Sequence, residues 1–330
     1  MAIETVPSID ITPFLSDAGS ARAQGVSAKD FFALPLEEKM ELDVSKGGAA
    51  WRGYMLQGGE HTHGRQDWKE GLYLGPEHGD DHPLVGMPLH GRNQLPDSRL
   101  PRMRHDVLSY LDQMTDLGKT LTDMLSLGLG LNAGYMRGKL LAPEPVVLFR
   151  CFKYTPLSAA SGTEGPTYGI GEHTDFGYLT ILKVDSPGLQ VLSPSDEWVD
   201  VPVVEDAFIV NVGDMLDQLT HGRFRSRPHR VQRPRAGAAA RYSFPVFFDF
   251  AWDAKMERLP LDHLPPPTEG DMAEARRRWA KTTFREVDGT WSRYLARKVQ
   301  KVFPGLALPD FEPNAAPSTR FQRVVDVGPG

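Results

Sequence analysis

Short apolar segments follow one another between residues 146 and 250 and form the clearest pattern in the chain. Most are rich in Val, Ile, Phe and Tyr and are separated by Gly, Pro, Ser or Asp, which is typical of β-strands. Because no helical period interrupts them, the pattern favours an antiparallel sandwich or jelly roll over a doubly wound sheet. The expected strands span residues 146–154, 178–184, 188–192, 198–201, 207–212, 229–232 and 241–248.

Helical periodicity is expected on both sides of this run. Residues 101–131 predict an amphipathic helix that stops in the glycine-rich stretch 128–134. Three prolines at 265–267 then break the chain, and a helical tail ends at Pro304 and Gly305. The apolar stripe of the first helix is Val107, Leu111, Met114, Leu121 and Leu125, and that of the second is Trp291, Leu295, Val299 and Val302.

The N-terminal third shows weaker patterns. Residues 8–15 alternate briefly between prolines and predict a short strand, and residues 16–30 predict a loop. A helix mixed with turns is expected from residue 31 to 40 and on to residues 51–54, and an irregular connection or lid from 75 to 101. We expect one compact unit of three regions: an N-terminal region (1–100), a helix with the catalytic core (101–264) and a helical tail (265–330).

Composition narrows the class of protein. The 330 residues are 40% hydrophobic and 24% charged, as in ordinary soluble proteins, and the net charge of -6 does not suggest nucleic acid as a partner. The arginines between 223 and 235 suit a solvated strand face or a pocket for a small anion. A single cysteine forms no intrachain disulfide, and neither a signal peptide nor ~18 consecutive apolar residues is found. The expectation is a cytoplasmic protein that does not bind a membrane.

His173 and Asp175 are the most informative pair of residues. Side chains two apart in extended chain point to the same side, so both can reach one metal ion while Thr174 points away. Alone, this spacing is weak evidence for a metal site, because a hydrogen-bonded pair at a strand end would show the same spacing. His229, near the start of a later strand, completes two imidazoles and one carboxylate, which is the facial triad of non-haem iron enzymes. Structural zinc favours a closed, cysteine-rich ligand set, which one cysteine cannot supply.

Arg241 and Ser243 repeat this spacing on a later strand. A guanidinium grips a carboxylate with two parallel hydrogen bonds, and the hydroxyl adds a donor. The alternative is an arginine that faces solvent from an edge strand. Of the other histidines, His61 and His63 are interpreted as surface or loop residues without a third ligand. No metal-ligand partners are expected for His78, His82, His90, His105 and His263.

Three segments carry a resemblance to a known family. Residues 171–182 read GEHTDFGYLTIL, residues 211–231 read NVGDMLDQLTHGRFRSRPHRV, and residues 241–245 read RYSFP. In this order they resemble the isopenicillin N synthase-like family of iron(II)- and 2-oxoglutarate-dependent oxygenases. The resemblance implies a mainly β fold with flanking helices around a double-stranded β-helix (jelly-roll) core. It also implies a dioxygenase that uses Fe(II), 2-oxoglutarate and O2 to oxidise, most simply to hydroxylate, a small-molecule substrate.

The same resemblance assigns roles to individual residues. It implies no catalytic residue beyond the metal ligands. Tyr154 resembles the aromatic residue that often touches the cosubstrate, although a packed core tyrosine fits its context equally well. Arg150, Lys153 and Phe247 are expected at the mouth of the barrel near the substrate, where either cation is alternatively solvated. The implied iron ligands are His173, Asp175 and His229, and the implied anchors of the distal 2-oxoglutarate carboxylate are Arg241 and Ser243.

The chain departs from the family pattern at two places. His221 stands where relatives carry asparagine, and we interpret it as a loop residue. Relatives also place a long helix and a Gly-Phe-Phe strand where this chain offers only residues 16–30, which predicts a shortened N-terminal region. Two alternatives stay open: an iron-dependent oxidase of the same family that does not use 2-oxoglutarate, and a metal-bound binding protein without turnover.

Overall fold

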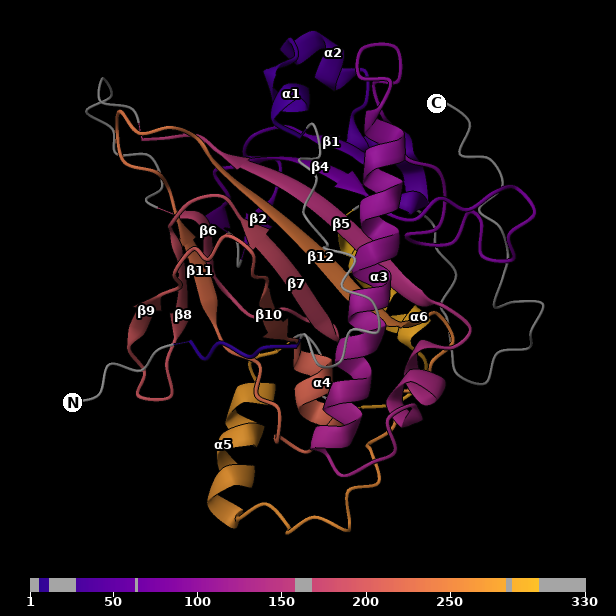
Figure 1. Cartoon of the computed structure of the whole chain (residues 1–330), viewed down its shortest axis with the longest axis vertical. Coiled ribbons are helices and arrows are strands. Elements are labelled where there is room, and N and C mark those ends of the chain that lie inside the picture. Colours follow the sequence, from indigo (N-terminus) through magenta and orange to yellow (C-terminus); the bar gives the residue numbers. More distant parts are fainter. Residues whose placement is uncertain (1–5, 12–27, 63–64, 158–167, 283–286, 303–330) are drawn as a thin grey trace.

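The computed structural model describes residues 6–11, 28–62, 65–157, 168–282 and 287–302. Within these ranges, two larger antiparallel sheets and a small two-stranded sheet are flanked by helices (Figure 1). The predicted mainly β architecture is therefore confirmed. The small sheet pairs β2 (His61–Thr62) with β3 (Arg65–Gln66).

The six-stranded sheet forms the body of the molecule. In spatial order it consists of β1 (Gly53–Met55), β4 (Glu70–Leu74), β5 (Pro145–Tyr154), β12 (Arg241–Ala251), β7 (Leu179–Val184) and β10 (Ile209–Val212). The four-stranded sheet consists of β6 (Tyr168–His173), β11 (His229–Gln232), β8 (Leu189–Leu192) and β9 (Trp198–Asp200).

Helices lie mainly around the six-stranded sheet (Figure 1). In the N-terminal region they are α1 (Ala28–Ala33), α2 (Leu36–Met40) and the 3₁₀ segment η2 (Val44–Ala50). The long helix α3 (Met103–Gly128) is followed by the π-helical turn η3 (Arg137–Leu141). The remaining helices are α4 (Asp214–Leu219), α5 (Glu269–Trp279) and α6 (Trp291–Val302).

All seven strands expected between residues 146 and 250 are present, with small shifts at their ends. The sequence patterns missed β1, β4 and β6, and also the two short strands β2 and β3. The predicted strand at 8–15 is wrong in its described part, because residues 6–11 form no strand and Ile9 is 73% exposed. Residues 12–27, which hold most of the segment predicted to be shortened, lie outside the described residues.

Helix α3 confirms the predicted amphipathic helix and crosses the six-stranded sheet (Figure 1). Its buried stripe differs from the prediction in the second half. Leu121 and Leu125 are only partly buried, whereas Gly118, Thr122 and Ser126 are buried. Small residues are needed there because a Cβ at Gly118 would lie 2.6 Å from the ring of Phe248. None of the described helices is both long and apolar enough to cross a bilayer.

Candidate metal centre

The predicted triad is brought together between β6 and β11. His173 ends β6 and lies directly opposite His229, the first residue of β11. Their ring centroids are 4.3 Å apart. Asp175 follows β6 by two residues, and its Oδ1 lies 3.8 Å from Nε2 of His229. One ligand atom from each of the three side chains lies within 4.8 Å of the other two.

Backbone carbonyls fix which nitrogen of each imidazole faces the centre. Nδ1 of His173 donates to the carbonyl of Gly171 at 2.8 Å, and Nδ1 of His229 donates to the carbonyl of Arg227 at 3.2 Å. Because Nδ1 carries the proton in both rings, Nε2 keeps a free lone pair. Two oriented imidazoles and one carboxylate suit a divalent iron ion and leave coordination positions open.

Neighbouring polar groups hold the carboxylate. Oδ2 of Asp175 accepts a hydrogen bond from Nδ2 of Asn211 at 3.2 Å, and the side chain of Thr180 donates a further one. Thr174 points away, as predicted, and its hydroxyl donates to Asp214 at 3.0 Å. Asn211, Thr180 and Asp214 were not predicted, because their roles depend on β10, β7 and α4 meeting in space.

The electrostatics of the cluster favour the protonation states of a metal site. Burial, and then the nearby charge of His229, lower the pKa of His173 to about 3, so its imidazole is neutral at pH 7. Burial alone would raise the pKa of Asp175, but the imidazoles of His229 and His173 and two hydrogen bonds bring it below its ordinary value. Neutral imidazoles and an ionised carboxylate are the forms that bind a metal ion.

Glycines allow the chain to turn tightly beside the cluster. A Cβ at Gly213 would lie 2.1 Å from the carbonyl oxygen of Gly177, and a Cβ at Gly177 would lie 1.9 Å from Oδ1 of Asp249. Neither position has room for a side chain. The close approach lets the backbone N–H of Asp214 donate to the carbonyl of Asp175 at 2.7 Å. This hydrogen bond fixes the start of α4 to the backbone of Asp175.

Arg241 and Ser243 lie on β12, a central strand, and are 1% and 3% exposed. The alternative of an outward-facing arginine on an edge strand is therefore wrong. Nη1 and Nη2 of Arg241 are buried and have no hydrogen-bond partner among the described residues. The guanidinium lies 5.0 Å from the ring of Tyr154, whose hydroxyl is 3.2 Å from Oγ of Ser243. The three side chains thus share one face of paired strands.

The expected substrate residues separate into two groups. Arg150 and Phe247 lie on the same sheet face as Arg241, and the Arg150 guanidinium is 5.1 Å from the Phe247 ring. Lys153 lies on the opposite face, where its Nζ pairs with Oε1 of Glu70 at 2.8 Å. The structure therefore does not bring Lys153 to the site, because side chains alternate between faces along a strand.

Sequence patterns also missed a buried ion network on the site's side of β5. Nζ of Lys69 pairs with Oε2 of Glu60 at 2.8 Å, and Nη1 of Arg150 lies 3.4 Å from Oε1 of the same carboxylate. Burial would raise the pKa of Glu60, but the charges of Lys69 and Arg150 lower it to about 2. The positive charge of Lys69 also contributes to the low pKa of His173, which places this network beside the metal cluster.

The other described histidines lie outside the group formed by His173, Asp175 and His229. His61 and His105 are exposed, and His263 bonds to the carbonyl of Leu129. His63 lies outside the described residues. His221 has a φ of 56°, the left-handed conformation that Asn and His tolerate, so it is a loop residue after α4. The prediction that three further histidines lack partners is wrong, because they meet in space: His78, His82 and His90.

An antiparallel β fold that gathers two imidazoles and one carboxylate is characteristic of non-haem iron oxygenases. The profile of the 2OG-Fe(II) oxygenase superfamily matches residues 145–250, and that of the non-haem dioxygenase in morphine synthesis N-terminal region matches residues 6–98. The chain belongs to this superfamily, which confirms the predicted class of iron(II)- and 2-oxoglutarate-dependent dioxygenases.

Individual relatives agree with this assignment. A probable iron/ascorbate oxidoreductase of Dictyostelium discoideum is 36% identical over 84% of this chain and 80% of its own length. A 2-oxoglutarate-Fe(II) type oxidoreductase of Emericella nidulans is 33% identical over 79% of this chain and 84% of its own length. In fold, the chain is similar to a full-length Neurospora crassa protein solved in complex with alpha-KG, with a TM-score of 0.66, 23% identity and coverage of 88% and 84% of the two chains.

Proposed function

We propose that this enzyme hydroxylates a small organic molecule, with His173, Asp175 and His229 as the iron ligands and Arg241 as the anchor of 2-oxoglutarate. The observation that carries the proposal is the buried Arg241 guanidinium, which lies on the site face with two nitrogens lacking hydrogen-bond partners among the described residues. Burial lowers the pKa of Arg241 in spite of the nearby charge of Asp185, so a carboxylate ligand gives a physical reason for the position of this cation.

The protein residues divide the work between binding and orientation. Arg241 grips the distal carboxylate of 2-oxoglutarate, and Ser243 and Tyr154 complete the polar end of its pocket. Asn211 and Thr180 hold the Asp175 carboxylate toward the metal, and backbone carbonyls hold both imidazoles. When bound, Fe(II) supplies the redox chemistry that couples conversion of 2-oxoglutarate and O2 into succinate and CO2 to insertion of oxygen into a C–H bond.

The substrate side of the pocket combines aromatic rings with charge. The Arg150 guanidinium lies 4.3 Å from the ring of Tyr73 and 4.8 Å from that of Trp51. Tyr73 and Trp51 are buried and Glu60 pairs with Arg150, so both signs of charge lie beside apolar rings here. Next to such a cluster, we infer a small, partly aromatic or heterocyclic substrate that carries a polar group. The Neurospora crassa protein that is similar to this chain in fold has also been solved with thymine.

Binding of 2-oxoglutarate tests the proposal directly. Wild-type protein with Fe(II) and 2-oxoglutarate under anaerobic conditions should show a visible charge-transfer band, and His173→Ala should lose it. Arg241→Lys should raise the half-saturating 2-oxoglutarate concentration about 10- to 100-fold, because one ammonium cannot replace a bidentate contact worth roughly 1.5–3 kcal/mol. Arg235→Lys, in an exposed loop, is the matched control. Equal half-saturation in both variants would contradict the proposed anchor.

A second candidate is an oxidase that uses the iron site without 2-oxoglutarate. Two relatives from Dictyostelium carry names of this kind, an iron/ascorbate oxidoreductase and a 1-aminocyclopropane-1-carboxylate oxidase, but the matching family and its other relatives favour the 2-oxoglutarate-dependent reaction. A metabolite screen that measures O2 uptake and succinate separates the candidates. The proposed enzyme releases one succinate per substrate oxidised, whereas the oxidase consumes O2 without succinate.

A further inference from the structure

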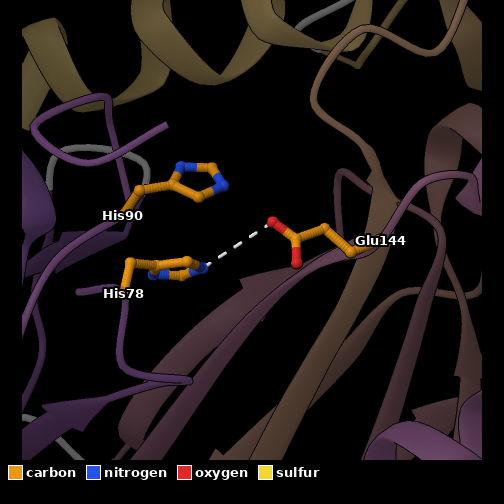
Figure 2. A group of neighbouring side chains, drawn as sticks. All are labelled: His78, His90 and Glu144. Carbon is orange, nitrogen blue, oxygen red and sulfur yellow. Dashed lines mark ion pairs between the residues drawn. The ribbon is translucent and has the colours of Figure 1, made fainter. Parts of the chain in front are cut away.

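A second group of metal-ligating side chains lies outside the iron centre. The irregular segment between β4 and α3 brings His78 and His90 together, because the carbonyl of Gly91 accepts the backbone N–H of His78 and Glu77 forms a bridge with Gly91. Glu144, the residue before β5, faces both rings, and each ring turns a nitrogen toward its carboxylate (Figure 2). One ligand atom from each of the three side chains lies within 4.8 Å of the others.

Hydrogen bonds around the cluster define the free lone pairs. Nδ1 of His90 donates to the carbonyl of Pro88 at 2.8 Å, which leaves Nε2 unprotonated in the neutral ring. Nδ1 of His78 is buried without a hydrogen-bond partner among the described residues. Its Nε2 lies 3.9 Å from Oε1 of Glu144, too far for a hydrogen bond. Two ligands of one zinc ion, each at ~2.0–2.2 Å, lie about 3–4 Å apart.

His82 orients the carboxylate of the cluster. Its Nδ1 accepts the backbone N–H of Leu84 at 3.2 Å, so the proton of the neutral ring is on Nε2. Nε2 lies 3.0 Å from Oε1 of Glu144 and donates to it. A carboxylate ligand held by a hydrogen bond from a neighbouring side chain is typical of metal sites.

The protonation states also suit a metal. Burial, followed by the neighbouring imidazoles, lowers the pKa of His78 to about 4 and that of His90 to about 3. Both rings are therefore neutral at pH 7. The buried guanidinium of Arg52 opposes a further cation here, but Glu77 offsets part of its charge. His78 and His90 are 8% and 2% exposed, so the ligands are shielded from water.

We propose that His78, His90 and Glu144 form a second metal site that binds a divalent transition metal such as Zn²⁺, with His82 as the orienting residue. Glu144 and Tyr154 are separated by the length of β5, about 30 Å at ~3.3 Å per residue. The second site therefore lies at the opposite end of this strand from the 2-oxoglutarate anchor. A bound ion would tie the irregular segment after β4 to the start of β5 and stabilise the fold.

Zinc stoichiometry tests the proposal on the full chain. The iron ligands are first removed in the background variant H173A/H229A, and Zn²⁺ is titrated by calorimetry into the metal-free protein. We expect two zinc ions per wild-type chain and one per background chain. Adding Glu144→Gln or His90→Ala to the background should weaken the remaining zinc affinity at least about tenfold. Adding His105→Ala, an exposed histidine on α3, should leave it unchanged.

Co²⁺ gives a second readout, because visible bands of the background variant should disappear on adding His90→Ala. Glu144→Gln replaces a half-exposed carboxylate, and circular dichroism together with the iron–2-oxoglutarate band of the single variant checks that the fold is kept. Absence of zinc binding by the background variant at about 100 μM would overturn the proposal. Equal zinc affinity with and without Glu144→Gln and His90→Ala would also overturn it.

Discussion

Arg241 carries its charge on a central strand, with the guanidinium shielded from water by Tyr154 and the neighbouring strands. Nε donates to the carbonyl of Ser186, and the two outer nitrogens have no hydrogen-bond partner among the described residues, so they are free to bind the proposed carboxylate. Such a side chain is held in its binding geometry before the ligand arrives, so little rotational freedom is lost on binding. This is why a lysine, with a flexible point charge, is expected to be a poor replacement.

Asp249, like Arg241, is a buried ionisable residue. Its Oδ1 accepts the backbone N–H of Tyr178 at 2.8 Å, and burial raises its pKa to about 7, with a further contribution from Asp175. Because this folded-state pKa exceeds the ordinary value of 3.8, the folded protein loses stability as pH rises from about 4 through 7. Asp249→Asn keeps the acceptor and cannot ionise.

We therefore expect Asp249→Asn to gain stability relative to wild type between pH 5 and 8, by roughly 2–3 kcal/mol. Urea unfolding of the metal-free proteins at several pH values measures this difference. Asp112→Asn, an exposed carboxylate on α3, should follow the wild-type pH profile. A constant difference between Asp249→Asn and wild type across this pH range would contradict the assigned titration.

The two histidine clusters show what spacing predicts and what it cannot. His173 and Asp175 are two residues apart, so local chain geometry alone brings their side chains together. His90 and Glu144 are far apart in sequence and meet only because β4, α3 and β5 are packed around the irregular segment between them. No periodicity encodes such a meeting, so the sequence alone predicts no metal-ligand partner for His78 and His90.

At the scale of elements, α3 illustrates how packing replaces large apolar residues with small ones. Thr122 and Ser126 turn their hydroxyls back to helix carbonyls, and the Thr122 hydroxyl accepts a hydrogen bond from Tyr178 at 3.1 Å. The amphipathic pattern placed Leu121 and Leu125 on the buried face instead. The helix lies so close to β12 that leucine does not fit opposite Phe248.

Two glycines of α3 form a matched test of this close packing. Gly118→Ala would place a Cβ 2.6 Å from the Phe248 ring and should destabilise the protein by about 1–3 kcal/mol, although alanine favours the helix. Gly128→Ala meets no atom within 4 Å and should be neutral or stabilise by up to about 1 kcal/mol. Chemical denaturation measures both. Equal effects of the two changes would show that helix propensity, not contact with β12, determines stability.

The strands that sequence patterns missed have compositions unlike ordinary strands. β6 contains two glycines in six residues, and β4 begins with a glutamate and a glycine. β4 is nevertheless buried along its whole length, because neighbouring strands cover its edges and Glu70 is paired. Tertiary pairing thus overrides weak strand propensity at both positions.

At the scale of the whole molecule, Glu70 joins the N-terminal region to the core. Its Oε2 accepts hydrogen bonds from Nζ of Lys39 at 2.8 Å and from the hydroxyl of Tyr54 at 2.7 Å. Its Oε1 accepts from Nζ of Lys153 on β5. One carboxylate therefore connects α2, β1, β4 and β5. The expectation that residues 1–100, 101–264 and 265–330 form one compact unit stays a prediction.

Glu70→Ala should lower the free energy of unfolding by about 3–5 kcal/mol, because it leaves the buried ammonium of Lys39 without its counter-charge. Glu38→Ala removes a pair with the largely exposed Arg99 and should lower it by less than about 1 kcal/mol. Guanidinium denaturation measures both variants. A loss below about 1 kcal/mol for Glu70→Ala would mean that the N-terminal region does not depend on this network.

The pairing of β12 with β5 and β7 constrains how the chain can change in length during evolution. Arg241 lies opposite Tyr154, and Ser243 lies opposite Phe152 and Val184, so both neighbours fix the register. One residue inserted between Ser243 and Phe248 would shift the pairing and turn Arg241, the proposed cosubstrate anchor, to the other sheet face. Residues 235–239, just before the strand, are exposed and unpaired in either sheet. Proteins that evolve from this chain should therefore gain or lose residues within 235–239 and not from Arg241 onward.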